Sequence, residues 1–208
     1  MNHHYFDEGK PAGRLLIYLS NRAKLSDQFL ETIYPMLEDS KRKSNFECPK
    51  EEGVSKTAIW IDEGFGCCYE LVADENGVRS PVIVGIYPAG TIMLDEHGFF
   101  NGAVSNLHYV VKKRSVFIPF STVDFQELAM KAPEAATLAI NVVAENKRYE
   151  QERSWLLRMD KWERRDAMIA FFGRKIEEIF SFKELASYLD MTEQYYGKMK
   201  KESLMKKG

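Results

Sequence analysis

The stretch from Ser181 to Lys201 reads SFKELASYLDMTEQYYGKMKK and carries the signals of two short helices joined by a tight turn. Ser181 and Glu184 form an S-x-x-E capping box, in which each side chain accepts a free backbone N–H of the first helical turn. Asp190 tolerates a left-handed turn better than most residues, and Thr192 is a good N-cap for a second helix. This pattern is typical of a DNA-reading helix-turn-helix, although an αα-hairpin at the end of a helical tail would share it.

The charge of the chain gives weak support to DNA binding. A net charge of −2 provides no overall attraction to nucleic acid or to acidic membranes. The charge is uneven, because five lysines stand against Glu202 alone between Tyr196 and Gly208. A lysine-rich C-terminus is also a common solvated tail, so this asymmetry does not decide the function.

Composition predicts a folded protein of one large or two small domains. The chain has 208 residues, of which 45% are hydrophobic and 29% charged. Cys48, Cys67 and Cys68 form neither a disulfide framework nor a metal-binding C-x-x-C pair, as is usual in a reducing cytoplasm. No signal-peptide pattern and no apolar run of ~20 residues occurs, so we expect a cytoplasmic protein with no membrane partner.

The first 120 residues change from a helical to a β pattern. Leu15, Leu16 and Leu19, and then Leu25, Phe29 and Ile33, follow helical spacing within residues 14–39. Short segments rich in β-branched and aromatic residues follow, each bounded by turn residues such as Asp74 to Gly77. They predict a barrel or sandwich from about residue 44 to residue 120, with strands at 57–61, 66–73, 82–87, 107–111 and 115–120.

Residues after Phe120 return to helical spacing. Ser121 opens a short helix, and Pro133 to Met159 contain no glycine and no second proline, which allows about seven helical turns. Apolar residues on more than one side of this helix favour a partner helix, most simply a second copy across a two-fold axis, although both sides could pack within one chain. Its main stripe is Leu138, Val142, Glu145, Tyr149 and Leu156, flanked by Ile140, Val143 and Trp155.

A further helix starts at the cap-like pair Asp160 and Glu163 and stops near Gly173. The short turn from Leu157 to Asp160 before it is a candidate hinge. We therefore predict an α+β protein: a jelly-roll or cupin-like β-barrel with flanking helices, a long dimerisation helix, and a helix-turn-helix domain. The predicted boundaries are 1–132 for the sensor domain, 133–159 for the long helix and 160–208 for the DNA-binding domain.

This order of elements resembles the Crp/Fnr superfamily of bacterial transcription regulators, with a divergent sequence. SFKELASYLDMTEQYYGKM is similar to the helix-turn-helix of that family. LLRMDKWERRDAMIAFF resembles the helix that leads into its DNA-binding domain, particularly in Bacteroidetes-type members, and RSVFIPFSTVDFQEL resembles its last barrel strand and the start of the dimer region. The resemblance implies a homodimer through Pro133 to Met159 that binds double-stranded DNA, with RNA polymerase as a further partner.

The resemblance also implies which residues meet DNA. Glu193, Gln194 and Lys198 occupy the slots from which family members reach base edges. Arginine is typical of the first slot, whereas Glu193 could only accept from a cytosine amino group; Gln194 could pair with adenine and Lys198 with guanine. Phosphate contacts are expected from Lys183, Lys200 and Lys201.

The predicted ligand site departs further from the family. Members that bind cyclic nucleotides use a Gly-Glu segment for the ribose and an arginine beside Ser or Thr for the phosphate. The matching region here is GTIMLDEHGFFNGAVSNLHYVV, and no arginine lies between Arg79 and Arg114. Cyclic AMP is therefore not expected as a ligand, and no cofactor is predicted. The candidate ligand-binding residues are Asp95 and Glu96 for a ribose, and Ser105 and Asn106 at the phosphate position.

Two other functions stay open. One is a sensor or adaptor dimer that has lost DNA binding and acts through protein partners. The other is a cupin-like small-molecule-binding enzyme, which needs a metal or an acid/base pair. His97 and His108 are not spaced as cupin metal ligands, and no nucleophile–base pair is evident, so we expect no enzyme activity.

Overall fold

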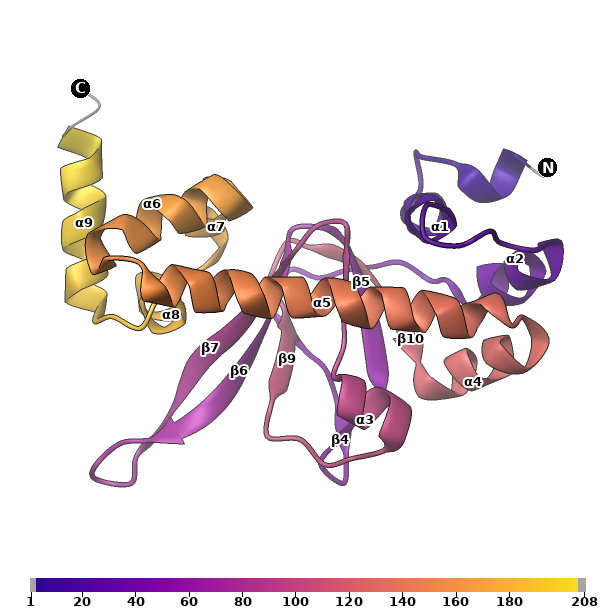
Figure 1. Cartoon of the computed structure of the whole chain (residues 1–208), viewed down its shortest axis with the longest axis horizontal. Coiled ribbons are helices and arrows are strands. Elements are labelled where there is room, and N and C mark those ends of the chain that lie inside the picture. Colours follow the sequence, from indigo (N-terminus) through magenta and orange to yellow (C-terminus); the bar gives the residue numbers. More distant parts are fainter. Residues whose placement is uncertain (1–2, 206–208) are drawn as a thin grey trace.

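Two four-stranded antiparallel sheets lie face to face at the centre of the computed structural model, which describes residues 3–205 (Figure 1). The long helix α5 (Glu134–Arg158) crosses both sheets and links a group of N-terminal helices to a group of C-terminal helices. The α+β class and the order of elements predicted from the sequence are confirmed. The strands form two separate sheets, so we describe the predicted barrel domain as a sandwich.

The strands divide between the two sheets as follows. The first sheet has the order β1 (Ser40–Lys41), β10 (Val116–Ser121), β5 (Thr57–Glu63), β8 (Thr91–Met93), and the second has the order β2 (Phe46–Glu47), β9 (His108–Val111), β6 (Phe65–Ala73), β7 (Arg79–Pro88). A separate two-stranded sheet pairs β3 (Lys50–Glu51) with β4 (Val54–Ser55). The β6–β7 hairpin projects from the body of the molecule and turns at Asp74 to Gly77, as predicted (Figure 1).

Two groups of helices flank the sandwich. On the N-terminal side these are η1 (His3–Phe6), α1 (Pro11–Ser20), α2 (Asp27–Ile33), η2 (Tyr34–Met36), α3 (Glu96–Asn101) and α4 (Thr122–Lys131). On the C-terminal side they are α6 (Lys161–Phe172), α7 (Ile176–Ile179), α8 (Phe182–Tyr188) and α9 (Glu193–Met205). None of the helices in residues 3–205 is long and apolar enough to cross a membrane.

Strand β5 shows why the sequence of the sandwich lacks simple alternation. Ile59 and Ile61 point between the sheets and pack with Phe117, whereas Ala58 and Trp60 point outward against the N-terminal helices. All of these residues are buried. Because both faces of the strand are covered, nearly every position is apolar.

Side-chain caps set the starts of α2, α4 and α6, two of them at the predicted residues Ser121 and Asp160. Ser26 accepts the Phe29 N–H, and Ser121 forms a full capping box with Asp124. Asp160 accepts the Trp162 N–H and starts α6, which ends before Gly173 at φ +80°. Each cap provides a partner for backbone donors that the helix itself leaves free.

Helix α3 contains His97 and Gly98, two residues whose types are typical of a turn. Both residues lie inside this six-residue helix, with Asp95 as its N-cap and Gly102 at φ +65° after its end. The helix is too short to show a 3.6-residue period, and its glycine is a weak helix former. A glycine is required at position 98 because a Cβ there would lie 2.8 Å from the Ser55 carbonyl oxygen.

Candidate nucleic-acid interface

Helices α8 and α9 form the predicted helix-turn-helix. The Ser181 N–H donates to Glu184 Oε2 at 2.8 Å and the Glu184 N–H donates to Ser181 Oγ at 3.2 Å, which completes the capping box. Asp190 has φ +53°, the left-handed conformation expected in the turn. The Tyr195 N–H donates to Thr192 Oγ1 at 3.2 Å, so Thr192 caps α9. The local chemistry of the motif was therefore predictable from its residues.

A buried polar network fixes α9 against the rest of the domain. Tyr196 is fully buried, and its hydroxyl donates to Glu177 Oε1 at 2.7 Å. Arg165 donates to both oxygens of Glu177 at 3.0 and 2.9 Å. Burial raises the pKa of Glu177, but the hydrogen bonds from Tyr196 and Arg165 lower it by more, so the net pKa lies below its ordinary value. Tyr196 is thus a core residue.

Arg164 joins the end of the long helix to the helix-turn-helix. Its guanidinium donates to the carbonyl of Leu189 at 2.8 Å, to that of Leu157 at 2.8 Å and to that of Met159 at 3.2 Å. These carbonyls end α8 and α5, where a cation is favourable. The candidate hinge from Leu157 to Asp160 is therefore braced by Arg164.

The outward face of α9 carries most of the side chains predicted to meet DNA. Glu193, Gln194, Lys198 and Lys201 are all exposed. Lys198 Nζ lies 5.4 Å from the centroid of the Trp162 ring. Helix α9 lies at the end of the molecule away from the sandwich, so this face is open (Figure 1).

The other two predicted DNA contacts lie elsewhere. Lys183 is exposed on the first turn of α8. The ammonium of Lys200 turns inward, 3.6 Å from Glu177 Oε2 and 4.7 Å from the centroid of the Phe182 ring. The next residue, Lys201, is exposed on the side of α9 that faces away from the domain.

Neither a protein-family model nor a curated protein sequence matches this chain. Solved structures do match it. FixK2 from Bradyrhizobium japonicum has a TM-score of 0.64 at 15% identity, over 82% of this chain and 85% of that chain. The c-di-GMP responsive regulator CLP from Xanthomonas campestris has a TM-score of 0.61 at 13% identity, over 87% and 93%. A regulator of the Crp/Fnr family from Eubacterium rectale has a TM-score of 0.63 at 9% identity, over 88% and 85%.

The chain has the Crp/Fnr regulator fold. This confirms the resemblance noted in the helix-turn-helix and in the helix before it. CLP and the Eubacterium rectale protein are described as regulators of gene expression. Among residues 3–205, no group of three His, Cys, Asp or Glu residues could hold a metal ion. Burial also raises the pKa of Cys48, Cys67 and Cys68 to about 12, so these thiols are not activated as nucleophiles.

The four predicted ligand-binding residues of this Crp/Fnr fold have separate surroundings. Asp95 is buried at the start of α3, where its Oδ1 accepts the Gly98 N–H and its Oδ2 has no hydrogen-bond partner within residues 3–205. Glu96 lies 3.8 Å from exposed His97. Ser105 Oγ accepts the Leu107 N–H, and Asn106 is exposed.

Large side chains fill the space between the two sheets. Tyr87 and Tyr109 are buried there with Cys68, Met93 and Phe117. Tyr87 Oη lies 4.0 Å from Cys68 Sγ. Burial raises the pKa of both tyrosines, so their hydroxyls stay neutral at any physiological pH. The interior of the sandwich is therefore packed with uncharged groups.

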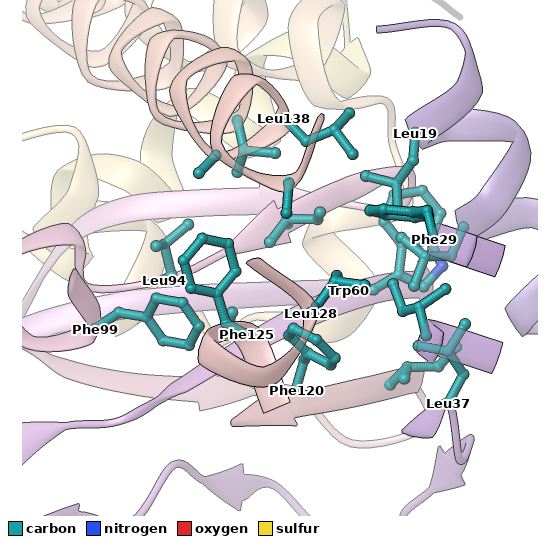
Figure 2. Close-up of a pocket in the computed structure, with 18 of the residues that line it drawn as sticks. Leu19, Phe29, Leu37, Trp60, Leu94, Phe99, Phe120, Phe125, Leu128 and Leu138 are labelled. Carbon is teal, nitrogen blue, oxygen red and sulfur yellow. The ribbon is translucent and has the colours of Figure 1, made fainter. Parts of the chain in front are cut away.

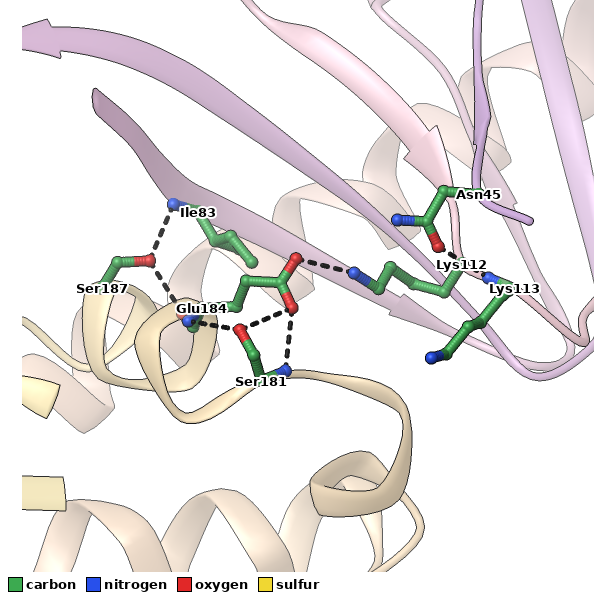
Figure 3. Close-up of polar contacts among 7 residues, drawn as sticks. All are labelled: Asn45, Ile83, Lys112, Lys113, Ser181, Glu184 and Ser187. Carbon is green, nitrogen blue, oxygen red and sulfur yellow. Dashed lines mark hydrogen bonds and ion pairs between the residues drawn. The ribbon is translucent and has the colours of Figure 1, made fainter. Parts of the chain in front are cut away.

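The helix-turn-helix is docked directly on the sandwich, which the sequence did not indicate (Figure 3). The Lys112 ammonium donates to Glu184 Oε1 at 2.7 Å and lies 4.7 Å from the centroid of the Phe180 ring. The Ile83 N–H, on the edge strand β7, donates to Ser187 Oγ at 3.2 Å. Beneath these contacts, apolar residues of both parts share one buried cluster: Phe65, Cys67, Ile83, Ile86 and Val110 of the sandwich with Phe180, Leu185, Ala186 and Tyr188 of the C-terminal helices.

Arg164, Lys112 and Ser187 hold the C-terminal helices in place, and only Arg164 could have been recognised from the sequence. Arg164, Met168 and Phe172 recur at i, i+4 and i+8 and are all buried, so a cation stands at a core position of α6. A charged residue at a core position indicates a buried polar network. Lys112 and Ser187 follow no comparable pattern, because their partners lie 72 and 104 residues away.

Proposed function

We propose that this protein is a homodimeric, sequence-specific DNA-binding transcription regulator. The observation that carries the proposal is the outward face of α9, where Gln194, Lys198 and Lys201 are exposed on a helix anchored by buried Tyr196. An exposed recognition helix of this kind fits the major groove, in which an amide pairs with adenine and an ammonium with guanine. A cytoplasmic location and RNA polymerase as a partner are part of this proposal.

Glu193 sharpens the expected DNA sequence preference. It lies in the first turn of α9, where its charge is favourable to the helix but repels phosphate. At a base edge it would accept from the amino group of cytosine. The half-site is therefore expected to combine a cytosine with the adenine and guanine read by Gln194 and Lys198.

The first prediction separates base reading from phosphate binding. Lys198→Ala is expected to weaken binding to the preferred duplex about 10-fold and to relax the preference at one base pair. Lys201→Ala is expected to weaken binding to all sequences alike and to reduce the slope of log affinity against log salt by about 1. The duplex is selected from a random pool, and affinity is measured by fluorescence anisotropy at two salt concentrations.

Lys43→Ala is the matched control, because Lys43 is exposed and lies far from α9 in the sequence. Its affinity and salt slope should equal those of the wild type. DNA binding through α9 is excluded if Lys198→Ala and Lys201→Ala both leave affinity and selectivity unchanged.

The outward side of α5 supports the dimer. Ile140 is 70% exposed and Trp155 is 53% exposed, while the opposite side of the helix packs into the monomer through Leu138, Val142 and Leu156. The exposed positions 140, 144, 147, 151 and 155 are spaced 4, 3, 4 and 4 residues apart along one side of the helix, with small or polar residues at 144, 147 and 151 between the two apolar ends. A second copy of α5 across a two-fold axis would cover both apolar side chains.

The second prediction tests this interface. The double variant Ile140→Glu, Trp155→Glu is expected to be a folded monomer at concentrations where the wild type is a dimer, because two carboxylates would be buried against their own copies. Size-exclusion chromatography with light scattering measures the mass. Met130→Glu is the control, since Met130 is 81% exposed on α4 and its replacement should leave the dimer intact. A dimeric double variant would place the interface elsewhere.

We propose that cyclic AMP is not the signal. Tyr87 and Tyr109 occupy the interior of the sandwich, and no arginine between positions 79 and 114 is available for a cyclic phosphate. The second candidate function is a dimer that acts through protein partners alone, which Glu193 favours by placing an anion at the tip of α9. Salt-independent failure to select any duplex from the random pool would favour this second function.

A further inference from the structure

An apolar cavity lies outside the sandwich, between its first sheet and the helices that cover it (Figure 2). Its volume is about 90 Å³. Side chains from many parts of the chain converge on it, among them Leu19 and Phe29 from the N-terminal helices, Trp60 from β5, Phe125 from α4 and Leu138 from α5. The cavity is therefore separate from the interior of the sandwich, where Tyr87 and Tyr109 lie.

The walls offer no free polar group. All the lining residues are Leu, Ile, Val, Ala, Phe or Trp. Trp60 is the only one of them with a polar side-chain atom, and its Nε1 donates to Asp62 Oδ1 at 3.4 Å. Asp62 is itself paired with the guanidinium of Arg14. A charged or hydrogen-bonding molecule would lose its water partners on entry and gain none, which excludes it.

Polar contacts around the cavity fix the positions of the helices that form its walls. Glu145 accepts from Tyr18 Oη at 2.6 Å and from Arg22 Nη2 at 2.6 Å, which holds α1 against α5. Asn141 Nδ2 donates to the Arg22 carbonyl at 3.1 Å. Glu134 accepts the Ser26 N–H at 2.8 Å and fixes the start of α2. These contacts oppose collapse of the helices into the empty space, which protein interiors otherwise leave in few places.

We propose that this cavity binds one small, uncharged, apolar molecule of about the size of a single aromatic ring. A leucine-lined cavity of about 150 Å³ is known to stay dry and to bind benzene, and the present cavity matches its chemistry at a smaller volume. The bound molecule contacts Leu138, Ala139 and Val142 of α5. Occupancy therefore stabilises the attachment of α5 to the sandwich. The inference does not rest on DNA binding.

Benzene is the probe, and phenol is its polar counterpart of nearly the same shape. Added to the 208-residue chain at ten times its Kd, benzene is expected to raise Tm by about 3 °C, because a ligand that binds only the folded state stabilises it by mass action. Phenol is expected to bind at least about 10-fold more weakly, since its hydroxyl finds no partner in the cavity. Absence of a benzene effect, or equal effects of benzene and phenol, overturns the proposal.

A matched pair of variants places the probe on α5. Ala139 lines the cavity, whereas Ala136 lies on the exposed side of the same helix. Ala139→Leu is expected to fill part of the space and to weaken benzene binding at least about 10-fold, and Ala136→Leu is expected to leave it unchanged. Equal benzene affinity in the two variants overturns the assignment.

Crystals of the wild-type chain under xenon pressure give a test that needs no variant. We expect a xenon atom enclosed by Phe99, Phe125 and Leu138. Xenon found only at other positions, or not at all, contradicts the proposed site.

Discussion

Replacing Arg164 with methionine is expected to lower the free energy of unfolding by about 3 kcal/mol. The guanidinium donates to the carbonyls of Leu157, Met159 and Leu189, and Arg164 is buried, so methionine would leave three helix-end carbonyls without these donors. Urea denaturation of the 208-residue chain measures this loss of stability. Because the same side chain braces the turn between α5 and α6, we also expect the folded Arg164→Met variant to bind DNA more weakly than the wild type.

Arg158→Met is the matched control, because Arg158 is exposed at the end of α5. Its effect should stay within about 0.5 kcal/mol. Arg164→Lys should recover only part of the stability, since an ammonium cannot reproduce the planar fork of donors. A loss below about 1 kcal/mol for Arg164→Met would show that the hinge is held by apolar packing instead.

The ion pair between Lys112 and Glu184 is expected to respond unequally to removal of its two partners. Lys112 is 4% exposed, whereas the Glu184 side chain is 35% exposed and also accepts from Ser181. Glu184→Gln leaves a buried ammonium without a charged partner and should cost about 2 kcal/mol. Lys112→Met leaves a carboxylate that keeps Ser181 and water, and should cost less than about 1 kcal/mol. Urea denaturation of both variants gives the comparison.

The ion pair is expected to make the stability of the protein fall at low pH. Burial raises the pKa of Glu184, but the hydrogen bonds from Lys112 and Ser181 outweigh it, so the folded pKa lies below the unfolded value of about 4.3. A lowered pKa contributes stability that is present above the unfolded pKa and lost as the pH falls through the folded pKa. Wild-type stability should therefore drop below about pH 4.3, and Glu184→Gln should flatten this drop. If Glu184→Gln and Lys112→Met lose the same free energy of unfolding, and Glu184→Gln keeps the wild-type dependence of stability on pH, the pairing is contradicted.

Local signals in the sequence predicted most of the helices and the main strands. Ser121, Asp160, Ser181 and Thr192 each cap a helix through contacts within a few residues, so their chemistry is readable from neighbours alone. The strands were less exact. The predicted segment 82–87 is the core of β7 (Arg79–Pro88), whose first three residues are exposed and lack an apolar pattern.

Contacts between distant segments could not be predicted in the same way. Lys112 looks like an ordinary turn lysine, and only the packing of α8 against the sandwich buries it. Lys200 looks like an exposed phosphate contact, but Glu177 draws it inward. The apolar cavity could not be predicted either, because a void depends on how side chains from many distant segments pack together and not on the pattern of any one segment.

The shared apolar cluster between the sandwich and the C-terminal helices limits the modularity of this protein. Phe180, Leu185 and Tyr188 are buried partly against Phe65 and Ile83, so separating the two parts would expose apolar surface on both. The C-terminal helices after α5 are therefore unsuited to transplantation onto another regulator. Cutting the chain after α5 would yield two fragments that expose apolar surface and tend to aggregate. A substitution on one side of this contact must be compensated on the other, so the sandwich and the C-terminal helices are expected to diverge together.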